Sequence, residues 1–318
     1  MNVLDLLPIS VATLSTSSLI QADLYCRGED SEAATLYRAA EIAIRDEDLT
    51  RLRDRGVTQL YIQPEDRAAY QSYLRELANE EGPNPSSSAQ HAAVLNEVVL
   101  DVLETSFDGG TIDDAVGATR QLSKMAANLV TRADFAAPDL FRVLHHDYAT
   151  FTHSANVAFY SGVLARALAF TDDDIEQIIA GGLLHDLGKL QIDDAILTKP
   201  SKLDDLEFHA IKKHPLRGFQ QLARREDLSW GQLMMAYQHH ERLDGGGYPV
   251  GVTEDAIHPW AKLCAVVDIY EAVTSHRPYR KPMPREQALS ILSRESGKAL
   301  DPEMVQCWIS VIQNTTPT

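Results

Sequence analysis

One short segment divides this chain into two parts of different character. Gly82-Pro-Asn-Pro-Ser-Ser-Ser88 holds two prolines and three serines in seven residues, and such a run continues neither a helix nor a strand. At 318 residues, the chain also exceeds the usual size of a single domain. We therefore expect a small N-terminal domain over residues 1–81, a linker over residues 82–88 and a larger domain over residues 89–318.

The N-terminal part has the pattern of a small α+β module. Residues 11–44 hold short β-like runs, and residues 57–62 form a further candidate strand. Helices are expected over residues 46–55 and from residue 63 to about residue 81. This part shows no catalytic constellation, so a sensor, an oligomerisation element and a dock for a signalling partner all stay open. Its strand edges would also allow a homodimer.

The part after the linker has the pattern of a helical bundle. Apolar residues recur at helical spacing over residues 89–106 and 111–133, and helices with polar loops continue to about residue 312. We therefore predict a mainly α protein, in which an all-helical C-terminal bundle follows the small α+β domain.

The charge and the cysteine content exclude several classes of protein. A formal net charge of -17 argues against a binder of nucleic acid polymers, which are held largely by Lys and Arg. Three scattered cysteines are too few for a disulfide framework or a cysteine zinc site, which fits a reducing cytosol. There is no convincing signal peptide, and no segment has the roughly 20 apolar residues that cross a bilayer. We expect a soluble cytoplasmic protein with no membrane association.

The histidines give the main functional signal. Ten of the eleven lie beyond residue 144, and several stand beside each other or beside Asp. The segments of interest are Thr152-His-Ser154, Leu184-His-Asp-Leu-Gly-Lys189, Lys213-His-Pro215 and Gln238-His-His-Glu241, followed by Val267-Asp-Ile269. Imidazoles together with carboxylates suit Fe, Mn or Zn better than Ca or Mg. The histidines interpreted as ordinary surface or core residues are His145, His146, His209, His258 and His276.

The adjacent pair His185-Asp186 is suited to gripping a metal. On a helix, neighbouring side chains point about 100° apart and can hold one site only if it lies across their shared edge. The two oxygens of Asp186 could then bridge two ions, about 3.5 to 4 Å apart, that activate a hydroxide and clamp a phosphodiester. Lys189 falls on the face of His185, where its charge could neutralise a phosphate oxygen or a leaving alkoxide. Taken alone, Lys189 also fits a solvated helix cation, and Gly188 a helix end.

The order of these segments resembles the HD superfamily of metal-dependent phosphohydrolases, and one run narrows the resemblance to the HD-GYP subgroup. That run is His239-His-Glu-Arg-Leu-Asp-Gly-Gly-Gly-Tyr-Pro-Val-Gly251, with the naming triplet Gly247-Tyr248-Pro249. Its glycines would let a loop approach a ligand closely, although without the histidine pair the run would fit a flexible surface loop. The match covers roughly residues 140–312, with further segments at Ile196-Leu-Thr-Lys-Pro200, Asp268-Ile-Tyr-Glu-Ala-Val-Thr274, Arg277-Pro-Tyr-Arg280 and Asp301-Pro302.

The resemblance implies an activity and a set of site residues. HD-GYP proteins hydrolyse cyclic di-GMP to pGpG and often onward to GMP, typically with iron or manganese. By this resemblance, Asp186 would bridge the metals and Lys189 would assist at the scissile phosphate. The implied substrate contacts are Gly247, Tyr248, Arg277 and Arg280. The implied metal ligands are His153, His185, Asp186, His214, His239, His240 and Asp268.

Two departures from the HD-GYP pattern shape these expectations. Some members that bind a third metal carry a Glu four residues before the first ligand histidine, and this chain has Ala149 there, which predicts two metal ions. Glu271 replaces the usual Asp, which keeps the charge but moves it relative to the substrate or to the ligands. Two other functions therefore stay open: a metal-bound receptor or scaffold with weak or no hydrolysis, and a phosphodiesterase for another cyclic dinucleotide such as 3′,3′-cGAMP.

Overall fold

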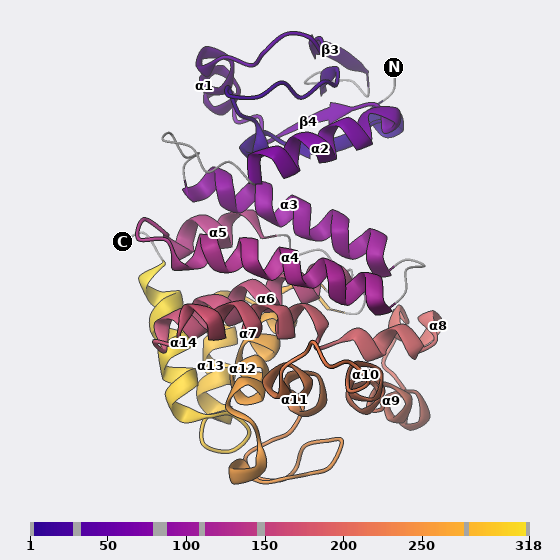
Figure 1. Ribbon diagram of the computed structural model, residues 1–318, viewed down its shortest axis with the longest axis vertical. Coiled ribbons are helices and arrows are strands. Elements are labelled where there is room, and N and C mark those ends of the chain that lie inside the picture. The colour runs from indigo at the N-terminus through magenta and orange to yellow at the C-terminus, as the bar shows by residue number, and fades with distance from the viewer. Residues whose placement is uncertain are drawn as a thin grey trace. The chain divides into compact units, whose positions relative to one another are not determined.

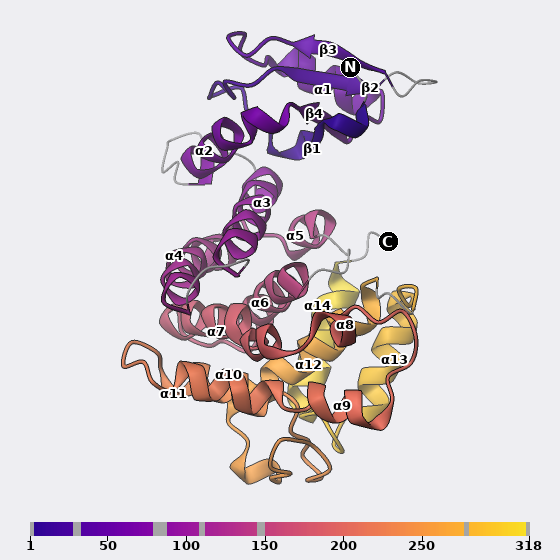
Figure 2. The same ribbon diagram turned by 90° about the vertical axis from the view of Figure 1, so that its right-hand side faces the viewer.

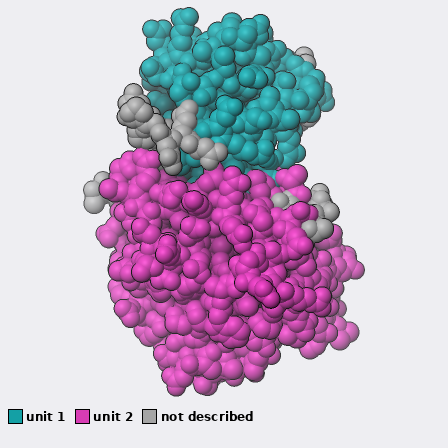
Figure 3. All heavy atoms as spheres, in the orientation of Figure 1, with its two compact units in different colours: residues 1–101, 139–143 teal, residues 102–138, 144–318 magenta. Residues whose placement is uncertain are grey.

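The computed structural model describes residues 3–27, 33–78, 88–107, 112–144, 150–276 and 280–315. The chain forms two compact units, which Figure 3 colours separately. The first unit holds residues 1–101 and 139–143, and the second holds residues 102–138 and 144–318. The predicted linker at residues 82–88 lies outside the described residues except for Ser88, so a domain boundary there stays a prediction.

The first unit is built on a four-stranded antiparallel sheet of order β1-β4-β2-β3. Its strands are β1 (Leu7–Ser10), β2 (Leu24–Arg27), β3 (Ala34–Arg38) and β4 (Gln59–Ile62). Along β4 every second residue is buried, so Leu60 and Ile62 join the core to which Leu24 of β2 also belongs. Helices α1 (Asp46–Asp54) and α2 (Arg67–Ala78) belong to this unit (Figure 1), together with most of α3 (Ser88–Phe107) and of α5 (Ala137–Val143), and the predicted α+β module is confirmed.

The second unit is a bundle of helices. The last residues of α3 (Ser88–Phe107), from Val102 on, belong to this unit. The first two residues of α5 (Ala137–Val143) belong to it as well. The other helices are α4 (Ile112–Thr131), α6 (Thr150–Ala167), α7 (Asp172–Leu184), α8 (Asp194–Leu197), α9 (Asp205–Ile211), α10 (His214–Leu222), α11 (Trp230–Gln238), α12 (Pro259–Thr274), α13 (Arg285–Glu295) and α14 (Pro302–Asn314). The predicted mainly α fold is confirmed. In the described part of the chain, no helix is both long enough and apolar enough to cross a bilayer.

Helix α7 packs against α4, α6 and α11. Thr171 sets its start, because the hydroxyl of this residue accepts a hydrogen bond from the backbone N–H of Asp174 at 3.1 Å. Gly182 in the last turn lets α6 come close, since a Cβ there would lie 2.7 Å from the Cα of Ala158. The C-terminal end of α7 therefore lies directly against α6 (Figure 2).

A turn of 3-10 helix from Leu187 to Gln191 follows α7 and packs against α10. Gly188 makes this contact possible, because a Cβ at that position would overlap the carbonyl oxygen of His214, the first residue of α10. Helix α10 packs in turn against α11, and α11 packs against α12. Gly188 thus does more than end a helix, since it lets two of the histidine-bearing segments meet.

The segment Asp301-Pro302 has a structural role at the start of α14. The Asp301 carboxylate accepts hydrogen bonds from the next two free backbone N–H groups, at 3.0 and 3.1 Å, and Pro302 occupies the first helical position. Trp308 of the same helix is fully buried, with its ring centroid 5.3 Å from those of Tyr160 on α6 and Tyr270 on α12. These contacts anchor the last helix to the two helices that carry His153 and Asp268.

Candidate metal centre

The residues predicted to bind metal converge in the second unit. They come from α6 (His153), the end of α7 (His185 and Asp186), the start of α10 (His214), the end of α11 (His239 and His240) and α12 (Asp268). All are buried except His240, whose side chain is 26% exposed. The structure places their potential ligand atoms in three overlapping groups, in each of which the atoms lie within 4.8 Å of one another. Metal ligation by these residues stays a prediction.

Backbone carbonyls orient three of these rings. The Nδ1 atoms of His185, His214 and His239 lie 2.7, 2.8 and 2.8 Å from carbonyl oxygens three or four residues earlier in the chain. A carbonyl oxygen can only accept, so each Nδ1 donates its N–H, and the neutral ring then carries its lone pair on Nε2. All three rings therefore present a lone pair to the centre of the cluster.

The lone pairs of His214 and His239 face each other. Their Nε2 atoms are 3.2 Å apart, and neither neutral ring has a hydrogen left to donate to the other. The Nε2 atom of His185 is buried and has no hydrogen-bond partner among the residues that the structure describes. Facing acceptors repel and a buried acceptor without a donor is costly, unless a cation lies between them. The set of donor atoms therefore fits a metal ion.

Asp186 lies between two separate groups of potential ligands. One group is His214, His239 and His240, and the other is His153, His185 and Asp268. The Oδ1 atom of Asp186 is 3.2 Å from Nε2 of His214, and its Oδ2 atom is 3.2 Å from Nε2 of His153. Each carboxylate oxygen thus faces a different group, which is the arrangement that a bridging carboxylate requires.

Glu271 holds the ring of His153 from the side opposite the cluster. The Nδ1 atom of His153 lies 2.5 Å from Oε2 of Glu271, while its Nε2 atom is 3.2 Å from Oδ1 of Asp268. Glu271 is buried and also accepts hydrogen bonds from the amide of Asn156, at 3.2 Å, and the hydroxyl of Ser275, at 2.6 Å. A carboxylate in this position fixes the tautomer and orientation of a ligand histidine. The residue that departs from the HD-GYP pattern therefore supports a predicted ligand.

Burial and neighbouring charges shift the pKa values in the cluster. Burial lowers the pKa of His239 well below its usual value, and the charge that His240 would carry lowers it further. Burial likewise lowers the pKa of His240, to about 3. Burial alone would raise the pKa of the Asp186 carboxyl, but the charge of Lys189 and contacts with histidines hold it well below its usual range. Neutral imidazoles and an ionised carboxylate are the forms that bind metals.

The predicted cations have different surroundings. The ammonium group of Lys189 forms an ion pair with Oδ2 of Asp186. The guanidinium of Arg280 donates to two backbone carbonyl oxygens near the end of α12, at 2.5 and 3.2 Å. Arg277 lies outside the described residues, and so does Ala149, the residue on which the expected metal count depends. Substrate contact by the two arginines stays a prediction.

The glycine-rich loop packs beside the histidine pair. The ring of Tyr248 lies over that of His240, with centroids 4.7 Å apart and planes at 31°. Gly247 allows the loop to pack, because a Cβ there would lie 2.5 Å from the Cα of Glu241. The buried carboxylate of Glu241 accepts hydrogen bonds from backbone N–H groups after Pro249, at 2.8 and 3.0 Å. These contacts favour a loop that is held in place over the alternative of a flexible surface loop.

The sequence singled out Glu271 as a departure from the HD-GYP pattern but did not predict its contact with His153, and it gave no role to Asn156 or Glu241. Glu271 lies one turn after Asp268 on α12, so helical spacing could have placed both carboxylates on one face. Asn156 lies one turn after His153 on α6 and gives the same signal. Glu241 adjoins the histidine pair, but its spacing does not indicate that it binds loop backbone.

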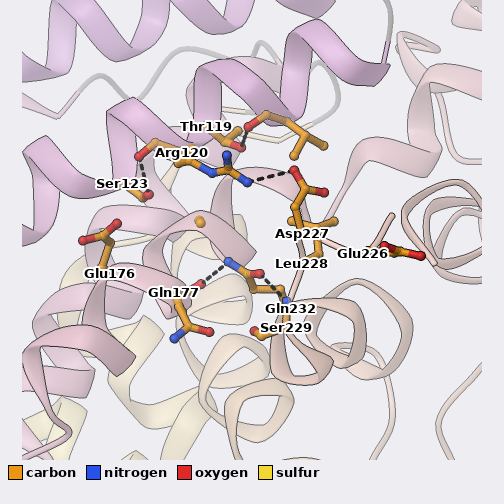
Figure 4. A pocket seen from close by; sticks show the side chains of 12 residues that line it. Thr119, Arg120, Ser123, Glu176, Gln177, Glu226, Asp227, Leu228, Ser229 and Gln232 are labelled. Carbon is orange, nitrogen blue, oxygen red and sulfur yellow. Dashed lines mark hydrogen bonds and ion pairs between the residues drawn. The ribbon is translucent and has the colours of Figure 1, made fainter. Parts of the chain in front are cut away.

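A separate pocket of about 350 Å³ lies in the same unit and does not include the predicted ligands (Figure 4). It is lined by residues of α4, α7 and the start of α11, together with the segment before α11. Arg120 pairs with Asp227 at 2.8 Å, and the amide of Gln232 donates to the backbone carbonyl of Gln177 at 3.2 Å. These four polar groups satisfy one another.

Comparisons with known proteins identify relatives of this chain. An HD domain model matches residues 119–304, more than half of the chain. A cyclic di-GMP phosphodiesterase of Pseudomonas aeruginosa is 32% identical over 281 residues, which are 83% of this chain and 67% of that protein. A 3′3′-cGAMP-specific phosphodiesterase of Vibrio cholerae is 41% identical over 160 residues, which are 48% of this chain and 33% of that protein. The chain thus spans between a third and two thirds of the length of these relatives.

A solved structure has the same fold. It is described as an HDGYP protein from Bdellovibrio bacteriovorus, and the TM-score is 0.65 at 20% identity, covering 97% of this chain and 100% of that one. The sequence match to the HD domain model is consistent with the clustered histidines and aspartates, since HD domain proteins depend on metal ions. The predicted resemblance is confirmed: the chain belongs to the HD domain family, and within it to the HD-GYP group.

Proposed function

We propose that this protein is a two-metal phosphodiesterase that hydrolyses cyclic di-GMP to pGpG and onward to GMP. The observation that carries the proposal is the position of Asp186 between two groups of potential metal ligands, with one carboxylate oxygen toward each group. Relatives that are named cyclic di-GMP phosphodiesterases support the substrate. Iron is the proposed metal and manganese the alternative, because imidazoles and carboxylates suit both ions.

The residues of the cluster would divide the work of the reaction. His214, His239 and His240 would hold one ion, and His153, His185 and Asp268 the other, with Asp186 between them. When bound there, the two ions supply the positive charge that activates a water molecule and stabilises the phosphate oxygens. Lys189 lies beside Asp186 and would offer its ammonium group to the oxygen that leaves the phosphorus.

The proposed substrate contacts come from the glycine-rich loop and from the segment after α12. Tyr248 covers His240, the most exposed of the predicted ligands, and is therefore placed to meet an incoming nucleotide. Gly247 precedes it in the loop, and Arg280 lies at the end of α12. Arg277 is proposed from the family resemblance alone. The N-terminal unit is proposed as the contact for a homodimer or a signalling partner.

A second candidate substrate is 3′,3′-cGAMP. The relative from Vibrio cholerae that is named as specific for this nucleotide is 41% identical to this chain over 160 residues, which favours it. Both nucleotides present the same phosphodiester to the proposed metals, and they differ in one base. The choice between them therefore depends on contacts to the bases and not on the metal chemistry.

Metal analysis and product analysis on protein purified without oxygen test the proposal together. The expected results are two iron or manganese ions per chain and the release of pGpG or GMP from cyclic di-GMP. Three ions per chain would refute the predicted metal count. Binding of cyclic di-GMP without product would favour the receptor or scaffold, and faster turnover of 3′,3′-cGAMP would favour the second substrate.

A further inference from the structure

Unlike Lys189 and Lys199, Lys212 is not neutralised by a carboxylate among the described residues. It lies between α9 and α10, two residues before the predicted ligand His214. Lys189 is paired with Asp186, and Lys199 is paired with Glu207 at 2.6 Å. Among the described residues, Lys212 has no ion-pair partner. Its full positive charge is therefore available to a ligand.

Two aromatic rings flank the ammonium group of Lys212. Its Nζ atom lies 4.7 Å from the ring centroid of Phe208, one helical turn earlier, and 5.3 Å from that of Tyr248 in the glycine-rich loop. Such cation–π contacts hold an ammonium group in place without cancelling its charge. Tyr248 also lies over His240. The side chains of Tyr248, Lys212 and Phe208 therefore form one continuous surface that begins at the predicted metal ligands. Phe208 is 47% exposed and ends this surface.

The charge of the proposed substrate calls for a cation at such a place. A cyclic dinucleotide carries two phosphodiester groups, and each bears a negative charge. The metal centre and Lys189 would serve the group that is cleaved, and the second group lies elsewhere on the ring. The chain has a net charge of -17, so its general field repels this second phosphate. A single placed cation beside the cluster would offset that repulsion locally.

We propose that Lys212 binds the second, uncleaved phosphate of a cyclic dinucleotide, and that the exposed ring of Phe208 stacks against a base of the same half of the ligand. This inference rests on the proposed function and extends it to a subsite at the edge of the same centre. Stacking on aromatic rings tolerates either purine base. The subsite therefore selects for a ring with two phosphates and leaves the choice between guanine and adenine to other contacts.

The substitution Lys212→Met removes the charge and keeps most of the aliphatic stem. Lys213→Met is the matched control, because Lys213 is the exposed next residue and its loss changes the net charge equally. With the metal-loaded full chain, Lys212→Met should raise the KM for cyclic di-GMP about 10-fold and leave kcat nearly unchanged. Lys213→Met should match the wild type, and Lys212→Arg should restore most of the affinity. Bis(p-nitrophenyl) phosphate has one phosphodiester, so its turnover should be equal in all four proteins.

Several results would overturn the inference. One is an equal KM for Lys212→Met and Lys213→Met, and another is an equal loss on both substrates, which would assign Lys212 to the cleaved phosphate or to the fold. If the wild type binds cyclic di-GMP without cleaving it, the proposed enzyme is refuted, and calorimetry then decides this inference: a dissociation constant about 10-fold higher for Lys212→Met supports it, and an unchanged one overturns it. A wild type that neither binds nor cleaves overturns both.

Discussion

A network of hydroxyl groups in the first unit and the histidine cluster in the second unit use buried polar groups in opposite ways. In the network the groups satisfy one another: the hydroxyl of Tyr70 lies 2.7 Å from that of Thr13, and the hydroxyl of Tyr73 accepts from a backbone N–H at 2.7 Å. In the second unit the Nε2 atoms of His214 and His239 face each other at 3.2 Å with no hydrogen to share. Paired groups hold a fold together, whereas unpaired groups that converge are prepared to bind an ion. The following predictions test this separation of roles.

Replacing Asp186 should have the largest effect, because both ligand groups depend on its carboxylate. Asp186→Asn keeps the shape but removes the charge and turns an amide N–H₂ toward one of the histidines. We expect a loss of metal affinity of about 100-fold or more, since removing even an outer partner of a ligand costs about 10- to 100-fold. Metal quantification measures the loss, and hydrolysis should fall with it. An Asp186→Asn protein that still holds two ions per chain would contradict the bridging role.

Glu271→Gln should have the next largest effect, through His153. The amide keeps one acceptor for the Nδ1 hydrogen of His153 but loses the negative charge that polarises the ring. Metal affinity should fall about 10-fold, as measured by competition with a chelator. Ser275→Ala is the control, because it removes one donor to the same carboxylate and leaves the bond to His153 in place. If both variants lose metal equally, Glu271 acts through general packing and not through the histidine.

The predicted ligands could be recognised from sequence because their signal is local. His185 and Asp186 are neighbours, and the order of the histidine segments along the chain matches the HD-GYP pattern. The bond between Asn156 and Glu271 joins residues 115 positions apart. It exists because α6 packs against α12, and no local pattern in the sequence encodes that packing. The contact between Asn156 and Glu271 was therefore not predicted, although Glu271 itself stood out as a departure from the HD-GYP pattern.

The fold, like the site, has parts that local sequence patterns predict and parts that they do not. The four helices that were given bounds were predicted within a few residues of α1, α2, α3 and α4, since periodicity is a local feature. Beyond residue 133, helices were expected without bounds. In the first unit, β2, β3 and β4 lie within the regions expected to hold strands, but β1 lies before them and was not predicted, and neither was the sheet order β1-β4-β2-β3. Strand β4 pairs with β1 on one side and β2 on the other, and strands of four or five residues carry too little pattern to specify their partners.

Acid should destabilise the second unit of the metal-free protein below about pH 6.5. The pKa of His240 falls from 6.5 to about 3 through burial, and the pKa of His239 is also well below its usual value. Both rings bind more protons unfolded than folded in this window, so the free energy of unfolding decreases as the pH falls. Burial lowers the pKa of His153, but the charge of Glu271 raises it overall. The stability that this raised pKa contributes to the folded protein is lost only as the pH rises above about 6.5.

Urea unfolding at a series of pH values measures this dependence. His240→Gln removes one titrating ring and should give a shallower slope between pH 6.5 and 5 than the metal-free wild type. The window stops above the range in which Asp186 and Asp268 titrate, because the pKa values of both carboxyls are well below their usual ones. An identical slope in the two proteins would show that His240 binds protons equally in the folded and unfolded states, which contradicts a lowered pKa in the folded protein.

Tyr73→Phe should have the smallest effect and confine it to the first unit. The change removes the acceptor for the backbone N–H of Ser15 and the donor to the carbonyl of Thr13, which lie 2.7 and 3.2 Å from the hydroxyl. A buried N–H without an acceptor lowers the free energy of unfolding by about 1–3 kcal/mol, which urea unfolding detects. Tyr237→Phe is the control, because in the described structure its hydroxyl makes no hydrogen bond. Metal content should be unchanged in both variants, since the hydroxyl network of the first unit is complete without an ion. Loss of metal from Tyr73→Phe would mean that the two units are not energetically separate.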